Sequence, residues 1–87
     1  MKSKSIYDRN HYILINCLRS FREKAGLTQQ ELGVRIGYDQ TLISKIENGD
    51  RRIDVIELRK MCIAMNVDII DFITEMERQI ALKFKEC

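Results

Sequence analysis

The 87-residue sequence contains no proline and only four glycines, so little in it interrupts a helix. Its three cysteines, at positions 17, 62 and 87, have neither the spacing of a zinc site nor the even number of a disulfide framework. No apolar run approaches the roughly 20 residues of a membrane span, and the N-terminus lacks the apolar core of a signal peptide. These absences favour an all-helical cytoplasmic protein that has no membrane partner.

The sequence also lacks a glycine-rich phosphate loop and the short motifs of serine hydrolases and zinc proteases. Catalysis needs converging groups with tuned pKa values, and a domain of this length leaves little room for a pocket that holds them. We therefore expect no enzyme activity, catalytic residue, metal, cofactor or small-molecule ligand. We expect Cys17 and Cys62 to be buried, and Cys87 to be a loose terminal residue.

Charge is distributed unevenly along the chain. Residues 1–52 carry ten Lys and Arg against six Asp and Glu, whereas residues 53–87 carry five against seven. A basic surface attracts anions such as nucleic acid. The N-terminal part is therefore predicted to meet an anionic partner, and the C-terminal part to serve another purpose.

Hydrophobic periodicity and capping signals predict five helices joined by short loops. They are expected over about 9–25, 29–36, 40–48, 55–65 and from 69 toward the C-terminus. The expected N-caps are Thr28, Asp39, Asp54 and Asp68. Glu31 and Glu57, each three residues after a cap, complete capping boxes.

Residues 28–47 form two short helices around a turn at Gly37. Their apolar residues are spaced so that both helices bury into one small core while crossing steeply, and Gly33 is expected where the helices approach most closely. This pattern is typical of a helix-turn-helix, whose second helix projects far enough to enter a DNA major groove.

The exposed side of that second helix is expected to present Gln40, Thr41, Ser44 and Lys45. Gln can bond adenine, Lys can bond guanine, and Thr can contact the thymine methyl group. Taken alone, these are ordinary solvated helix residues; within a helix-turn-helix we interpret them as candidates for reading bases.

Phosphate contacts are expected from polar residues on the same rim. The candidates are Gln29, Gln30, Arg35, Arg51 and Arg52. The two loop arginines could instead be plain surface charges. His11 is expected at the surface or its edge, and Tyr38 is expected to pack partly exposed beside the DNA.

Residues 18–52, LRSFREKAGLTQQELGVRIGYDQTLISKIENGDRR, resemble the lambda Cro/CI-type (XRE-family) helix-turn-helix regulators. The REKxGLTQQEL entry, the turn glycine and the ISKIENGxR exit all occur in register, and the similarity extends to about Val67. The resemblance implies a compact, five-helix, lambda-repressor-like DNA-binding domain with its helix-turn-helix at the second and third helices. It also implies that Gln29 touches a phosphate and braces Gln40, and that Arg22 forms a buried structural ion pair with Glu47.

The sequence departs from the family pattern at three positions. Gly33 stands where the family usually has Ala, Ile53 where many members have Pro, and Tyr38 where a small aliphatic residue is usual. None of these departures removes a predicted contact residue. The protein is similar to controller proteins of restriction–modification systems and to small phage or plasmid repressors, and the sequence does not choose between them.

The last helix has more apolar surface than a four-helix core needs, so we expect it to pair with a second copy. The predicted dimer-interface residues are Ile69, Phe72, Ile73, Met76 and Ile80. The alternative is that this helix only closes its own core. A two-fold dimer would place the two reading helices about 34 Å apart on an inverted repeat.

The sequence thus predicts an N-terminal arm over 1–8, a helix-turn-helix domain over 9–67, and a dimerising helix of the same domain over 68–87. The expected function is a bacterial, phage or plasmid-encoded, nucleoid-associated regulator that binds an inverted-repeat operator in double-stranded DNA as a homodimer. The alternative is an antitoxin that binds a toxin and represses its own promoter. A contact with RNA polymerase and the choice between repression and activation stay open.

Overall fold

The computed structural model describes residues 9–86, with side chains described to Lys83. The predicted N-terminal arm over 1–8 and Cys87 lie outside the described residues. Five helices and no strand form this part of the chain. They are α1 (Arg9–Lys24), α2 (Gln29–Ile36), α3 (Gln40–Glu47), α4 (Val55–Ala64) and α5 (Ile69–Glu86).

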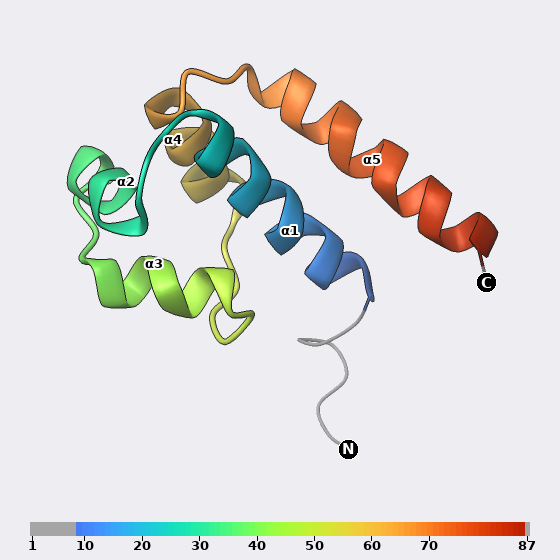
Figure 1. Cartoon of the computed structure of the whole chain (residues 1–87), viewed down its shortest axis with the longest axis horizontal. Coiled ribbons are helices and arrows are strands. Elements are labelled where there is room, and N and C mark those ends of the chain that lie inside the picture. The colour runs from blue at the N-terminus through green and yellow to red at the C-terminus, as the bar shows by residue number, and fades with distance from the viewer. Residues whose placement is uncertain (1–8, 87) are drawn as a thin grey trace.

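Helix α1 lies at the centre of the arrangement. Figure 1 shows α5 running alongside α1 in the opposite direction, with the α2–α3 pair on the other side of α1. Helix α1 contacts α3 and α5, and α4 contacts α2 and α5. The five-helix, all-α fold predicted from the sequence is therefore confirmed, and none of the helices described could cross a membrane.

Local capping sets the starts of α2 and α4 where the sequence predicted them. The Thr28 hydroxyl accepts a hydrogen bond from the Glu31 amide at 3.0 Å, and the Glu31 carboxylate accepts one from the Thr28 amide at 2.9 Å. Asp54 and Glu57 form the same reciprocal pair at the start of α4. Because each box satisfies two amides that have no partner within their helix, both helices begin at defined residues.

Helix α4 ends with a left-handed residue that is not glycine. Asn66 has a φ of 61°, and the Val67 amide donates to the Cys62 carbonyl at 2.8 Å. This 6→1 bond is the mark of a Schellman motif, in which Asn is the usual substitute for Gly. The sequence predicted this helix to run to about residue 65, and its last helical residue is Ala64.

The core is built from residues of all five helices. Its completely or almost completely buried side chains are Leu18, Leu32, Ile43, Ile46, Met61, Cys62 and Phe72. Cys17 is also buried, as predicted. Burial raises the pKa of the Cys62 thiol to about 11, so this thiol stays protonated at neutral pH.

One burial prediction was wrong. Val55, the first residue of α4, is largely exposed although it lies seven residues before the buried Cys62. His11 was expected at the surface and is buried. It lies one turn before Ile15 and two before Leu18, on the same inward stripe of α1.

The helix-turn-helix depends on a close approach at Gly33. A Cβ atom at this position would lie 2.3 Å from the Tyr38 carbonyl oxygen and 3.4 Å from Ile43 Cγ1. The amides of Gly37 and Tyr38 both donate to the Gly33 carbonyl, which draws the turn back over α2. Glycine therefore lets the turn into α3 pass closer to α2 than any other residue would.

We expect Gly33→Ala to lower the melting temperature. Alanine gains about 1 kcal/mol of helix propensity, but its Cβ must displace backbone at Tyr38, and overpacking of this kind costs about 1–3 kcal/mol. Thermal unfolding followed by circular dichroism measures the balance. The control is Val34→Ala, at the exposed neighbouring position. A Gly33→Ala variant that melts higher than the wild type would show that the turn relaxes without cost.

Candidate nucleic-acid interface

Helix α3 presents one polar face to solvent. Gln40, Thr41 and Lys45 are exposed, and Ser44 is half-buried. Their spacing at three and four residues places them on one side of the helix. Asn48, which the sequence analysis did not single out, extends this face by one turn, because its amide nitrogen lies 3.4 Å from the Ser44 hydroxyl oxygen.

The opposite face of α3 is buried. Ile43 and Ile46 lie in the core, and Glu47 has almost no exposed surface. Asp39 caps the helix by accepting a hydrogen bond from the Leu42 amide at 2.9 Å. Because one side of α3 is buried and its first turn is capped, the helix is held in place with its polar face toward solvent.

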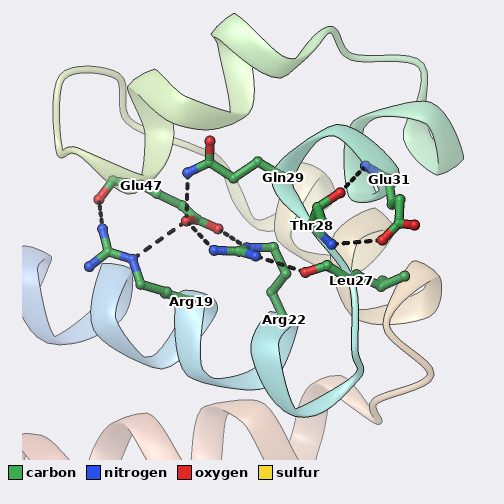
Figure 2. Close-up of polar contacts among 7 residues, drawn as sticks. All are labelled: Arg19, Arg22, Leu27, Thr28, Gln29, Glu31 and Glu47. Carbon is green, nitrogen blue, oxygen red and sulfur yellow. Dashed lines mark hydrogen bonds and ion pairs between the residues drawn. The ribbon is translucent and has the colours of Figure 1, made fainter.

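A buried ion pair between α1 and α3 holds the C-terminal end of α3. Arg22 Nε donates to Glu47 Oε2 at 2.6 Å and Nη2 donates to Oε1 at 3.0 Å, while Arg22 Nη1 donates to the Leu27 carbonyl at 2.7 Å (Figure 2). The resemblance implied this pair, and the structure contains it. Burial alone would raise the pKa of Glu47, but the hydrogen bonds from Arg22 and Gln29 outweigh it and lower that pKa.

Gln29 also belongs to this cluster. Its Nε2 donates to Glu47 Oε1 at 3.0 Å, and Figure 2 shows its carbonyl oxygen turned away from the carboxylate. The resemblance implied that Gln29 braces Gln40; the partner that the structure gives to the Gln29 amide nitrogen is Glu47. The start of α2 is therefore coupled to the end of α3 through one carboxylate.

Arg19 is a contributor that the sequence analysis missed. Its Nη2 donates to the Glu47 backbone carbonyl at 2.8 Å, and its Nε lies 3.5 Å from Glu47 Oε1. A cation at the last carbonyls of a helix satisfies an orphan acceptor and favours the negative end of the helix dipole. Its position three residues before Arg22, on the same side of α1, was the available signal.

A second cluster ties the turn before α3 to α4. Arg51 binds the Glu57 carboxylate with both terminal nitrogens, at 3.1 and 2.8 Å, and the Tyr38 hydroxyl donates to the same carboxylate. The Arg51 guanidinium also lies over the Tyr38 ring, 5.9 Å from its centroid. The charge of Arg51 is thus largely balanced within the protein.

Comparison with known proteins agrees with this geometry. Residues 18–72 match the helix-turn-helix family. The chain belongs to this family, the XRE-type helix-turn-helix proteins. It is 29% identical over 65 residues to the control protein C.MunI of Mycoplasma, covering 74% of this chain and 88% of that protein. It is 39% identical over 59 residues to the HTH-type transcriptional regulator y4dJ of Sinorhizobium fredii, covering 68% and 75%.

Solved structures show the same fold. An XRE-family-like protein from Pseudomonas syringae superposes with a TM-score of 0.78 at 36% identity, covering 87% of this chain and 93% of that one. The restriction–modification controller C.Esp1396I, solved as a tetramer on its natural 35-base-pair operator, superposes with a TM-score of 0.78 at 22% identity, covering 85% and 97%. The family is one of DNA-binding transcription regulators rather than enzymes.

The phosphate candidates of this XRE-family chain do not all lie together. Gln30 and Arg52 are exposed, and Gln29 lies at the start of α2 near the end of α3. Arg35 is different, because its Nη1 donates to the Ala64 carbonyl at 2.8 Å. Its guanidinium is directed to the C-terminal end of α4, and its phosphate contact stays a prediction.

The predicted dimer interface on α5 is corrected in one residue. Phe72 has no exposed surface, because it turns inward and its ring packs 5.2 Å from the Phe21 ring. The remaining four predicted residues are half-buried and pack against their own core. They are Ile69, Ile73, Met76 and Ile80. Much of the apolar surface that suggested pairing is thus used within the chain.

We expect Glu57→Gln to be less stable than the wild type at neutral pH but not at strongly acidic pH. Glutamine keeps the capping-box acceptor and loses the charge. The hydrogen bonds from Arg51 and Tyr38 lower the pKa of Glu57 to about 2, against about 4.3 in an unfolded chain. A carboxyl with a lowered pKa stabilises the fold above the unfolded value, and this stabilisation is lost as the pH falls through the folded value.

Urea unfolding at stepped pH measures the difference between variant and wild type, which we expect to shrink between about pH 4.5 and pH 2. Glu23→Gln, at an exposed position on α1, is the matched control. A stability difference of the same size at both ends of this pH range would contradict a role for the Glu57 charge.

Proposed function

We propose that this XRE-family chain is a sequence-specific DNA-binding regulator that inserts α3 into the major groove of an inverted-repeat operator as a homodimer. The observation that carries the proposal is that one side of α3 is polar and exposed while the other is buried. Its polar face is presented to solvent, while Glu47 on its back is held by Arg22, Arg19 and Gln29. A rigid, projecting helix is what reading of base edges requires.

The side chains on the polar face suit base reading. Gln40 can bond bidentately to adenine, Lys45 can donate to guanine O6 and N7, and Thr41 can offer its methyl group to thymine. Ser44 can donate or accept near the centre of the face. These four residues are the proposed base-reading set.

Phosphate contacts are proposed on both sides of α3. Gln29 and Gln30 lie in the first turn of α2, where the positive end of the helix dipole favours an anion. The proposed contacts after α3 are Arg52, which is exposed, and Arg51, whose guanidinium is held in place by Glu57. Such contacts set the register of the protein on the duplex without reading its sequence.

A homodimer supports this function because one short helix makes few base contacts. Two linked modules raise affinity by making the second contact intramolecular. The described residues extend 38 × 29 × 20 Å. Two such protomers side by side are of a size that suits two α3 helices about one DNA turn, roughly 34 Å, apart.

The proposal is tested by titrating the protein against the DNA upstream of its own gene in a gel shift, with an unrelated duplex as competitor. We expect a site bound at least ~10³-fold more tightly than the competitor, protected as two half-sites in footprinting. Equal, weak binding to both duplexes would reject the proposal.

We expect Gln40→Ala and Lys45→Ala each to cost about 1–3 kcal/mol on the cognate site and to relax base preference at one position. Each removes donors directed at a base edge. Binding to a library of half-site variants gives both quantities. Lys24→Ala, which removes a positive charge from an exposed position on α1, is the control. Unchanged specificity in Gln40→Ala would show that this residue does not read a base.

We expect Arg52→Ala to weaken binding to all sequences about equally. Loss of a phosphate contact releases one fewer counterion, so the slope of log affinity against log salt is reduced by about one unit per protomer. Affinities measured between low and physiological salt give this slope, and Lys24→Ala again is the control. A loss confined to the cognate site would assign Arg52 to base reading instead.

A further inference from the structure

A partly enclosed hollow of about 250 Å³ lies between α1 and α5, and we call it the α1–α5 hollow. Its apolar wall is formed on α1 by Ile13, Cys17 and Phe21. The side chains of α5 that line it are polar and follow one another at four-residue steps along one side of the helix. They are Glu75, Gln79 and Lys83.

The hollow forms because small side chains of α1 meet the polar side of α5. Cys17 and Ser20, which both line it, are too short to fill the space between the two helices. Large apolar residues of α5, such as the fully buried Phe72, point into the core instead. Burial raises the pKa of the Cys17 thiol, so this part of the wall stays uncharged at neutral pH.

Two cations lie at the edge of the α1–α5 hollow. Lys24 on α1 and Lys83 on α5 both line it, and both are exposed. Lys24 Nζ lies 5.7 Å from the centroid of the Phe21 ring, which places its charge close to the apolar wall. Asn16 and Ser20, also at the edge, bring hydrogen-bond donors that suit an anionic oxygen.

The one carboxylate among the lining residues has its own cation. Glu75 accepts hydrogen bonds from Arg78 at 3.0 and 2.9 Å and from Gln79 at 2.8 Å. These bonds lower the pKa of Glu75 to about 2, so at neutral pH the residue is an anion paired with Arg78. The two lysines therefore set the sign of the ligand that the hollow attracts.

We propose that the α1–α5 hollow binds a small monocarboxylate with a compact apolar body. The apolar body lies against Ile13, Cys17 and Phe21, and the carboxylate pairs with Lys24 and Lys83 at the edge. Pockets for drug-sized ligands have volumes of roughly 300–1,000 Å³, so the volume of this hollow suits a smaller molecule.

The hollow lies apart from the proposed DNA-reading surface. Figure 1 shows α5 on the other side of α1 from the α2–α3 pair, and none of the lining residues is a proposed DNA contact. A ligand in the hollow thus leaves the polar face of α3 uncovered. The hollow forms between helices that are distant in sequence, so spacing along the chain did not reveal it, and we set aside the expectation of no small-molecule ligand.

The test titrates 3-phenylpropanoate into the full chain without DNA, followed by isothermal titration calorimetry. We expect one saturable site per chain with a dissociation constant below about 1 mM, as is usual for so small a ligand. 3-Phenylpropanamide has the same apolar body without the charge. We expect the amide to bind at least about 10-fold more weakly, because it loses the attraction of both lysines.

A first variant blocks the hollow. Ser20→Leu places a larger side chain at its edge, and we expect this change to weaken binding of 3-phenylpropanoate at least about 10-fold, since a pocket buries most of its ligand. Thr74→Leu is the matched control, because Thr74 is exposed on α5 and does not line the hollow. Both changed positions are exposed, so both variants are expected to keep the far-UV circular dichroism of the wild type.

A second variant removes the charge. We expect Lys24→Gln with Lys83→Gln to weaken binding of the carboxylate to about the level of the amide, and to leave binding of the amide unchanged. A structural role of the lysines would instead change both affinities together. Arg59→Gln with Lys60→Gln, which removes two cations from exposed positions on α4, is the control.

Four results would overturn the inference. They are no saturable binding of 3-phenylpropanoate, equal binding of acid and amide by the wild type, a Ser20→Leu variant that binds as tightly as Thr74→Leu, and an unchanged affinity in the double lysine variant. Each is separate from the fate of the proposed function. A chain that selects its operator but binds no carboxylate would reject the hollow and keep the DNA reader, and a chain that binds the carboxylate but selects no DNA sequence would do the opposite.

Discussion

One buried carboxylate, that of Glu47, holds the three N-terminal helices in their relative positions. It accepts hydrogen bonds from Arg22 on α1 and Gln29 on α2, and its own backbone carbonyl accepts from Arg19. Removing one partner of a buried pair leaves an uncompensated charge and typically costs about 3–5 kcal/mol. The direction in which the polar face of α3 points therefore depends on the Glu47 contacts made on its buried side.

The turn between α2 and α3 is held by a different kind of constraint. At Gly33 the backbone of Tyr38 passes so close that there is no room for a side chain. The Tyr38 hydroxyl then donates to Glu57, whose carboxylate also accepts from the Asp54 amide in the capping box of α4 and binds Arg51. One carboxylate thus joins the turn, the loop after α3 and the start of α4. Gly33 and Tyr38 thus meet at this close approach.

The exposed side chains of α3 differ in kind from those of α4 and α5. The polar face of α3 carries the groups that suit base edges, whereas Ile56 and Ile63 on α4 and Ile70 on α5 are large apolar side chains that are exposed. The uneven charge along the chain follows this division.

Sequence alone determined the helices, their caps and the helix-turn-helix, because these depend on spacing and on bonds between residues three to five apart. The polar face of α3 follows from the same periodicity, and the Arg22–Glu47 pair from the family resemblance. Tertiary structure decided which side of each helix is covered by distant neighbours. In the tertiary structure His11 and Phe72 are buried, whereas Ile56 and Ile63 are exposed. Arg35 donates a hydrogen bond at the end of α4, and Arg51 binds Glu57. Periodicity marks an apolar stripe, but only packing settles whether the chain itself covers that stripe.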